Sequence, residues 1–305
     1  MIAQKEMSTR AWVELVSLGL VWGGVFLAVA VLLREIPVFT LVAIRVTVAA
    51  ALLWIYVLVR RRPIPRGWRV WGALLVMGCL NTAIPFTLLT FGQTQIESGL
   101  TSIFNAFTAV SGTVIAAMFL SDERMTQRKL LGAVFGVTGV AITVGLEALQ
   151  SFDIRSLAQL ACIGATISYA FAGVWARTQL KGIKADVATA GMLLGATLVM
   201  IPIALIFEGI PHLSISGKAW IAMLYYIPIA TAFAYILYFR IVEMAGSANT
   251  LLVTLIVSPV AVMLGALVLS EVLPIRAFLG FGFIAVGLII IDGRAVKRLK
   301  RVFSS

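Results

Sequence analysis

Ten apolar stretches, each about as long as a bilayer is thick, follow one another along this chain with little between them. A helix needs about 20 apolar residues to cross the hydrocarbon core. The stretches lie near 11–33, 37–59, 69–92, 96–120, 128–147, 157–177, 187–207, 217–239, 246–269 and 275–292. Charged residues make up 12% of the 305 residues, about half the fraction typical of a soluble domain. The sequence therefore predicts an all-α integral membrane protein with ten transmembrane helices.

Positive charge is concentrated in the segments that would share one side of the membrane. Nineteen Lys and Arg fall on that side, and four fall on the other: Arg34, Arg155, Lys218 and Arg276. Because Lys and Arg are enriched in cytoplasmic loops, we expect both termini in the cytoplasm of a bacterium, with the protein in the inner membrane. The net charge of +11 is then an orientation signal and not a nucleic-acid footprint.

The last two spans repeat the layout of two earlier ones. Segment 258–292 matches an earlier segment without a gap when it is moved back by 148 positions. The coinciding residues include Glu123 with Glu271, Gly132 with Gly280, and Gly139 with Gly287. This predicts an internal duplication, with repeats over 1–150 and 151–305. Five spans per repeat is an odd number, so the second copy would be inverted. We therefore expect two inverted five-helix repeats around a central cavity, which suits alternating access.

The first two spans each carry a residue that is unusual at its depth. Trp22 lies about halfway across, beside Gly23 and Gly24, whereas membrane tryptophans usually lie at the interfaces. It either packs against small residues or forms a wall of the cavity. Arg45 lies about 12 Å along its helix from Pro37, where a charge is costly unless it faces protein or water. It extends to the outer headgroups, clamps backbone carbonyls, or binds an anionic group such as a substrate carboxylate.

Prolines occur within the expected third, eighth and ninth spans. Pro85 follows Asn81 in the third span, Pro228 lies in the eighth and Pro259 in the ninth. Proline frees a backbone carbonyl and permits a bend, so these prolines are candidate hinges or gates. Asn81, which is polar inside an apolar span, is a candidate binding residue.

Further polar side chains lie deep in the later spans. Tyr169 lies near the depth that Trp22 has in the first copy, and Tyr235 carries a hydroxyl that needs a partner. The fourth and ninth spans bear polar residues at steps of three and four, which places them on one helix face. Such faces either join helices by hydrogen bonds or line a cavity. We favour cavity lining, with Asn105, Asn249 and Thr254 facing the substrate.

Glu123 and Glu271 each follow a span directly and precede the next helix. An acid near a helix N-terminus caps backbone amides and offsets the helix dipole. We interpret both as hairpin caps, and a gating role is the alternative.

Several kinds of chemistry have no signature in the sequence. The acids lie near span ends or in loops, and the lone histidine, His212, lies in a loop. The chain has no Walker motif and no HExxH motif, and Cys79 and Cys162 lack metal-site spacing. A proton-coupled pump usually displays a buried ionisable relay. We therefore expect no enzyme activity, no metal and no cofactor, and we favour facilitated transport down a gradient.

The ten spans, the duplication and the pattern P…(S/G)E…G…G at Pro259, Glu271, Gly280 and Gly287 resemble the drug/metabolite transporter superfamily, specifically its EamA-type permeases. The first copy departs from this pattern with Ser111 in place of the proline. An arginine in the second span is also typical of these permeases. The mid-span WGG and the tyrosine-rich eighth span are similar to the branch that exports amino acids, including aromatic ones.

The leading hypothesis is an inner-membrane exporter of amino acids or related small metabolites. The expected partners are this substrate and the lipid bilayer. One alternative is a carrier of another metabolite or a drug, with proton coupling. An alternative of a different class is a membrane-embedded sensor or scaffold that transports nothing.

Overall fold

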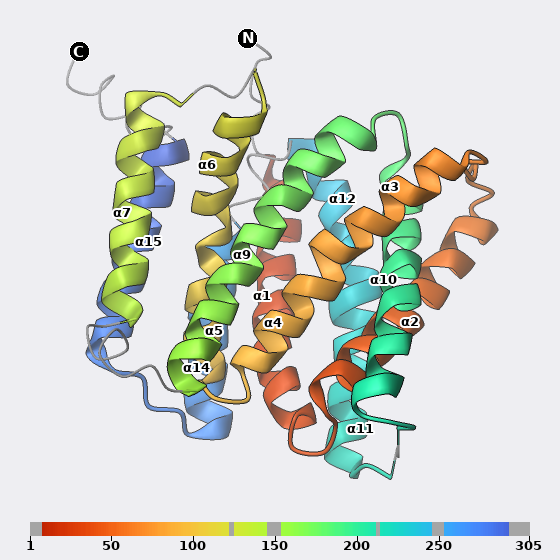
Figure 1. Cartoon of the computed structure of the whole chain (residues 1–305). Helices are drawn as coiled ribbons and strands as arrows, with labels where there is room; N and C mark the ends of the chain where they lie inside the picture. The colour runs from red at the N-terminus through yellow and green to blue at the C-terminus, as the bar shows by residue number, and fades with distance from the viewer. Residues whose placement is uncertain (1–7, 122–124, 145–153, 212–213, 246–252, 293–305) are drawn as a thin grey trace.

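The computed structural model describes residues 8–121, 125–144, 154–211, 214–245 and 253–292, and every regular element in these ranges is a helix (Figure 1). The elements are α1 (Thr9–Leu32), α2 (Val38–Val59), α3 (Trp68–Gly78), η1 (Cys79–Ala83), α4 (Ile84–Gly92), α5 (Ser98–Ala106), α6 (Thr108–Phe119), α7 (Gln127–Val144), α9 (Ile154–Gln179), α10 (Ala185–Phe207), α11 (Gly217–Leu224), η2 (Tyr225–Phe233), α12 (Ala234–Ala245), α14 (Val253–Leu269) and α15 (Ile275–Asp292). The expected all-α fold is confirmed.

Seven helices in the described part of the chain are long and apolar enough to cross a membrane. Four of them are the single elements α1, α2, α9 and α10. The other three are composite: α3 with η1 and α4, α5 with α6, and α11 with η2 and the start of α12. Two shorter apolar helices, Ile256–Leu269 and Ile275–Ile291, lie within α14 and α15. Helix α7 lies where a span is expected, but its 18 residues begin with Gln127, Arg128 and Lys129, which lower its mean hydropathy.

Two of the long helices widen into π-helical turns, η1 and η2, next to prolines. Pro228 lies inside η2, and Pro85 is the second residue after η1. Proline has no N–H, so a carbonyl about one turn earlier loses its helical partner. The Leu80 carbonyl, five residues before Pro85, instead accepts a hydrogen bond from the Ser168 hydroxyl of α9 at 2.7 Å. Turns of this type are frequent at functional sites.

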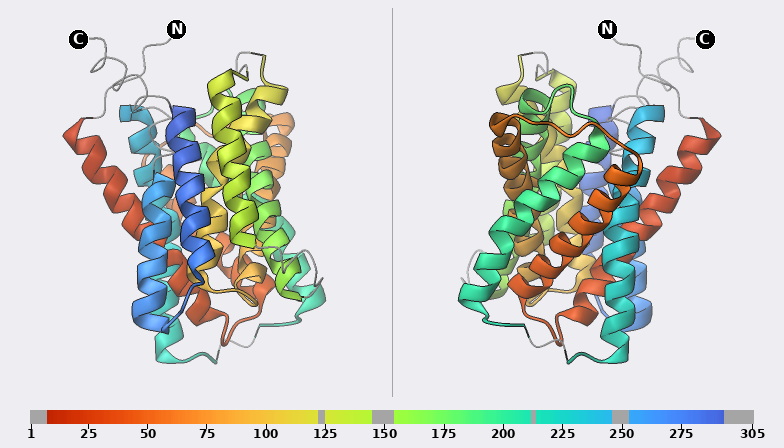
Figure 2. Two further views of the ribbon diagram at one scale, coloured as in Figure 1. Left: turned by 90° about the vertical axis from the view of Figure 1, so that its left-hand side faces the viewer. Right: turned by 90° about the vertical axis from the view of Figure 1, so that its right-hand side faces the viewer.

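Helices α7 and α15 pack side by side and antiparallel, through glycines, at one side of the molecule (Figure 2). A Cβ on Gly132 would lie 2.7 Å from the Gly287 carbonyl oxygen, and one on Gly139 would lie 2.6 Å from that of Gly280. A larger side chain would push the backbones apart. In the sequence repeat, Gly132 is equivalent to Gly280, and Gly139 is equivalent to Gly287. The two contacts are therefore reciprocal: each glycine meets the equivalent of the other glycine of its own helix.

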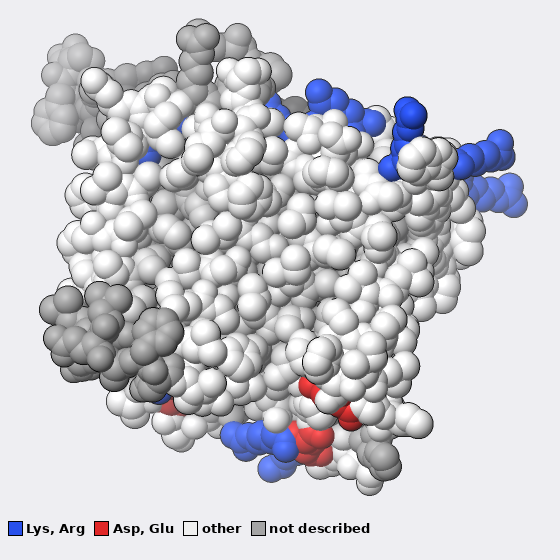
Figure 3. All heavy atoms as spheres, in the orientation of Figure 1, with Lys and Arg blue, Asp and Glu red and all other residues white. Residues whose placement is uncertain are grey.

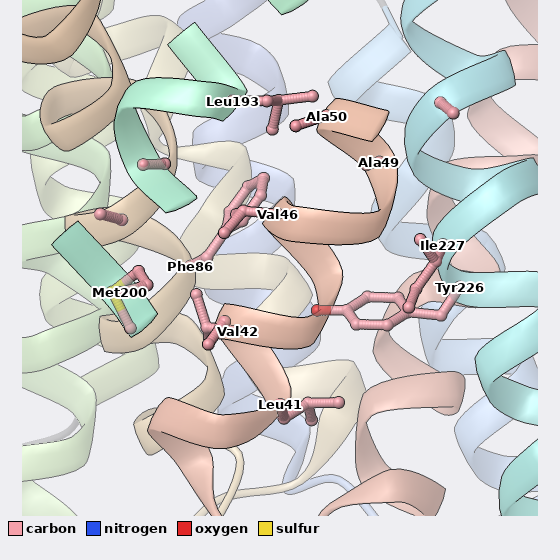
Figure 4. Close-up of a cluster of buried hydrophobic side chains, with 14 of the residues drawn as sticks. Leu41, Val42, Val46, Ala49, Ala50, Phe86, Leu193, Met200, Tyr226 and Ile227 are labelled. Atoms are coloured by element: carbon pink, nitrogen blue, oxygen red, sulfur yellow. The ribbon is translucent and has the colours of Figure 1, made fainter. Parts of the chain in front are cut away.

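The largest buried cluster lies where α2, α4, α10 and η2 meet (Figure 4). Leu41 and Val46 of α2, Leu193 of α10 and Tyr226 of η2 are fully buried, and the Tyr226 hydroxyl points toward α2. In lipid, such contacts stabilise a fold mainly by close packing, because exposed apolar surface costs little there. The cluster joins helices from both halves of the chain.

Carboxylates at one end of the molecule cap helices that are distant in sequence. Glu35, just after α1, accepts hydrogen bonds at 2.6 Å from both the backbone N–H and the hydroxyl of Ser216, the N-cap of α11. Glu208, at the end of α10, accepts from the N–H of Phe39 at 2.9 Å and of Thr40 at 2.7 Å, in the first turn of α2. Each acid satisfies amides that have no intrahelical partner.

Glu271 also caps a helix, but not the one that follows it. Its carboxylate accepts hydrogen bonds from the N–H groups of Ser98 at 2.8 Å and Gly99 at 3.0 Å, at the start of α5. This corrects the expectation of a cap within its own hairpin, and the cap joins the two halves of the chain. Glu123 lies outside the described residues.

Charge is distributed unevenly between the two ends of the molecule. In the view of Figure 3, Lys and Arg gather mainly at the upper end, where α2 ends and α3 begins, and the visible Asp and Glu lie at the lower end. The lower end is the one that carries the three carboxylate caps.

Candidate functional site

A cavity of about 540 Å³ lies among the helices α1 to α6, α9, α10, α12 and α14 and the turns η1 and η2, and its volume is in the range of small-molecule sites. Its lining extends from Gln93, at the end of α4, to Leu180 and Ala185, at the connection between α9 and α10. The connection lies at the end of the molecule opposite to the carboxylate caps (Figure 1). Among the described lining residues, none belongs to α7 or α15.

The structure brings most of the predicted binding residues together around this cavity. Seven of the eight line it: Trp22, Arg45, Asn81, Asn105, Tyr169, Tyr235 and Thr254. The eighth, Asn249, lies outside the described residues. Pro85, Pro228 and Pro259 lie in described helices but not in the lining, so their hinge or gate role stays a prediction.

Arg45 is the only charged residue among the described residues that line the cavity. The residue is 8% exposed. Its Nε donates to the Thr231 hydroxyl at 3.0 Å, and its Nη1 donates to the Tyr226 hydroxyl at 2.9 Å. Its Cζ lies 3.7 Å from the centroid of the Phe86 ring, at which distance the ring attracts a cation. Arg45 therefore points into the protein, which excludes its extension to the headgroups.

The residues that hold Arg45 are not among the predicted site residues. Tyr226 and Thr231 are fully buried and lie five positions apart in η2, where Thr231 also donates its hydroxyl to the Tyr226 carbonyl at 2.8 Å. In an α-helix, residues three or four apart share a face, whereas residues five apart do not. Only the π-helical geometry places Tyr226 and Thr231 on the same side of the helix. Pro228, which lies between them, is the one feature of the sequence that indicates this irregular turn.

Three aromatic side chains form another part of the lining. The Trp22 ring centroid lies 6.4 Å from that of Tyr235, in a T-shaped arrangement, and 5.7 Å from that of Tyr238. All three are half-buried, so part of each ring faces the cavity. Trp22 thus packs against aromatic rings as well as lining the cavity. The cluster offers apolar ring faces with polar edges, which suits a planar or apolar group of a ligand.

Amides and hydroxyls complete the lining. The Asn81 amide nitrogen lies 3.5 Å from the Met192 sulfur. Gln93, which the sequence did not single out, donates to the Phe26 carbonyl at 2.8 Å. The Thr108 hydroxyl is buried and has no hydrogen-bond partner among the described residues, so it can bond to a ligand.

The arrangement is suited to binding rather than to bond cleavage. A guanidinium stays protonated in proteins, so Arg45 provides a fixed positive charge and no proton transfer. Within the described residues, no three His, Cys, Asp or Glu side chains lie together as a metal site requires. A mostly apolar cavity with one cation fits a small molecule that carries one anionic group and an apolar part.

Comparison with known proteins gives a family match along most of the chain. The model of the EamA-like transporter family matches twice, at residues 11–145 and 156–292. One solved crystal structure superposes with a TM-score of 0.66 at 18% identity, over 94% of this chain and 98% of that chain. At this identity the superposition shows a shared fold only.

Curated relatives match most of the chain at low identity. The uncharacterized transporter YoaV of Bacillus subtilis is 24% identical, over 92% of this chain and 95% of its own length. A probable terminal-alkyne amino-acid exporter of Streptantibioticus cattleyicolor is 24% identical, over 96% of each chain. The protein PagO of Salmonella typhimurium is 25% identical, over 80% of each chain.

Proposed function

The chain belongs to the EamA-like transporter family, and from this premise we propose that it exports amino acids or related small metabolites across the bacterial inner membrane by alternating access. The protein is a multi-pass membrane transporter and not an enzyme. The resemblance to EamA-type permeases is thereby confirmed. One relative, the probable terminal-alkyne amino-acid exporter, supports amino acids as the substrate class.

Arg45 carries the proposal for the substrate. It is the charged group of the described lining, it faces the cavity from well inside α2, and a carboxylate is the small anion that its planar fork matches. The cluster of Trp22, Tyr235 and Tyr238 supports an apolar or aromatic side chain on the same substrate. Because a guanidinium stays protonated, Arg45 exchanges no proton itself, which favours transport down the substrate gradient.

Alternating access rests on the inverted repeat, with copies over 1–150 and 151–305. The two separate family matches support this division. The reciprocal glycine contacts of α7 and α15 support the inversion, because two equivalent helices run antiparallel only if the two copies have opposite directions. The proposal includes ten spans and both termini in the cytoplasm, because the positive-inside rule places the basic end there.

Counterflow into proteoliposomes tests the function. Vesicles loaded with a mixture of unlabelled amino acids would accumulate a subset of labelled ones without a pH or ion gradient. Arg45→Ala should abolish this accumulation. Arg45→Lys, which keeps the charge but loses the fork, should retain part of it. Arg69→Ala, at an exposed arginine outside the cavity, is the matched control and should transport normally.

The outcomes separate the alternatives. Thermal unfolding of each variant shows whether it is folded. Unchanged transport by a folded Arg45→Ala protein would overturn the role of Arg45. If folded wild-type protein accumulates no amino acid, the substrate is another metabolite or a drug, transport requires proton coupling, or the protein is a sensor or scaffold. Repeating the assay with an imposed pH gradient distinguishes coupling from the other two.

A further inference from the structure

The Arg45 guanidinium has five N–H donors, and its protein contacts are not spread evenly over its three nitrogens. Nε donates to Thr231 and Nη1 donates to Tyr226. No described residue accepts a hydrogen bond from Nη2, although the side chain lines the cavity. The ring centroids of Phe86 and Tyr226 lie 3.7 and 4.3 Å from Cζ and limit how the plane can turn.

We propose that Thr231 and Tyr226 are positioning residues, which orient the guanidinium so that its Nη2 edge receives the carboxylate of the substrate. The inference rests on the proposed function and extends it to residues that act through Arg45. With Nε occupied by Thr231, a carboxylate binds at the edge formed by Nη2 and the remaining Nη1 hydrogen.

The π-helical turn makes this arrangement possible. Thr231 accepts from Arg45 with the same hydroxyl that donates to the Tyr226 carbonyl, so the hydroxyl orientation is fixed by η2 itself. Tyr226 then supplies the second acceptor from the same turn. A long Arg side chain loses considerable rotamer freedom when it binds an anion, and a side chain already held in place loses less. The two residues therefore raise affinity for a carboxylate by holding Arg45 in place.

A charged and a neutral probe of the same shape test the proposal. The apparent affinities of purified protein for phenylacetate and phenylacetamide are measured from the rise in unfolding temperature with ligand concentration. Wild type should prefer phenylacetate. Thr231→Val and Tyr226→Phe should each weaken phenylacetate binding about tenfold, the usual cost of a lost hydrogen bond to a charged group, with phenylacetamide unchanged. Thr231→Ser keeps the hydroxyl and should retain wild-type affinity.

Matched controls separate positioning from general damage. Thr197→Val removes a buried hydroxyl that bonds only the Leu193 carbonyl of its own helix, and it should leave both affinities unchanged. In an Arg45→Ala background, Thr231→Val should cause no further loss, because residues that act through one group are not additive. In transport, the positioning variants should raise KM for the carboxylate substrate more than they lower the maximal rate.

Each result has a distinct meaning. Equal weakening of both probes by Thr231→Val, or no weakening of either, would overturn the positioning role. A wild-type protein without preference for phenylacetate would also overturn it. Failure of amino-acid counterflow together with an intact, Thr231-dependent preference for phenylacetate would sink the proposed function and leave the positioning role standing.

Discussion

The carboxylate of Glu35 holds the N-terminus of α11 from just beyond the end of α1. Hydrogen bonds from the Ser216 hydroxyl and the Ser216 N–H lower the pKa of Glu35 below its ordinary value. A carboxyl whose pKa is lower in the folded state stabilises the fold above its unfolded pKa, and this stabilisation is lost as the pH falls through the folded value. We therefore expect Glu35→Gln to lower the unfolding temperature at pH 7 and to have little effect at pH values below the folded pKa.

Thermal unfolding in detergent between pH 7 and pH 3 measures this difference between variant and wild type. Lys218→Gln, an exposed change in the first turn of the same helix, is the control and should show no such pH dependence. A Glu35→Gln effect of the same size at every pH would contradict the titration of Glu35 as its cause.

Individual residues show what a sequence reveals about a membrane cavity. Asn81 and Asn105 were identifiable because polar side chains stand out in apolar spans. Phe86 and Tyr226 were not, because an aromatic residue in such a span looks like ordinary packing, although both contact Arg45. The role of Thr231 depends on a π-helical turn that the usual helical spacing does not predict.

At the scale of elements, the α7–α15 pair depends on glycine at the points of contact. A Cβ on Gly280 would collide with the Thr143 hydroxyl and lie 2.5 Å from the Gly139 carbonyl oxygen. Gly280→Val should therefore destabilise the protein by about 1–3 kcal/mol, the usual cost of overpacking. Gly282→Val, two residues further along α15, is the matched control, because a Cβ there has no described atom within 4 Å.

The unfolding temperature and the yield of folded protein measure both variants. Equal stability of Gly280→Val and Gly282→Val would show that α15 can move away from α7 without cost. Transport by the surviving folded protein should be unchanged, because no described residue of α7 or α15 lines the cavity.

Helix positions followed from the sequence, whereas their pairing did not. The apolar stretches locate the helices because the length of a span is set by the bilayer. The cap of α5 by Glu271 joins residues 173 positions apart, and nothing in the spacing around Glu271 indicates that partner. A local rule favours the next helix, and the fold instead brings α5 of the other half to the carboxylate.

At the scale of the whole molecule, the three carboxylate caps lie at the end opposite to the one where Lys and Arg mainly gather. Each cap ties one half of the chain to the other at the end away from the α9–α10 connection, which the cavity lining reaches. We infer that the proposed carrier is open at its basic end in this conformation, because the three caps hold the two halves together at the other end. In the proposed orientation that end faces the cytoplasm, so the structure would correspond to an inward-facing state of the proposed cycle.

Single introduced cysteines test this orientation. Cys79 and Cys162 are first replaced by alanine, and a cysteine is then placed at Lys181, on the α9–α10 connection, or at Lys218, at the capped end; both positions are exposed. A membrane-impermeant maleimide added to intact spheroplasts should label Lys218→Cys and leave Lys181→Cys unlabelled, because only the capped end faces outward. Lysis should expose both cysteines equally, which controls for their reactivity. Labelling of Lys181→Cys alone in intact spheroplasts would reverse the orientation, and the conformation with the caps closed would then be the outward-facing one.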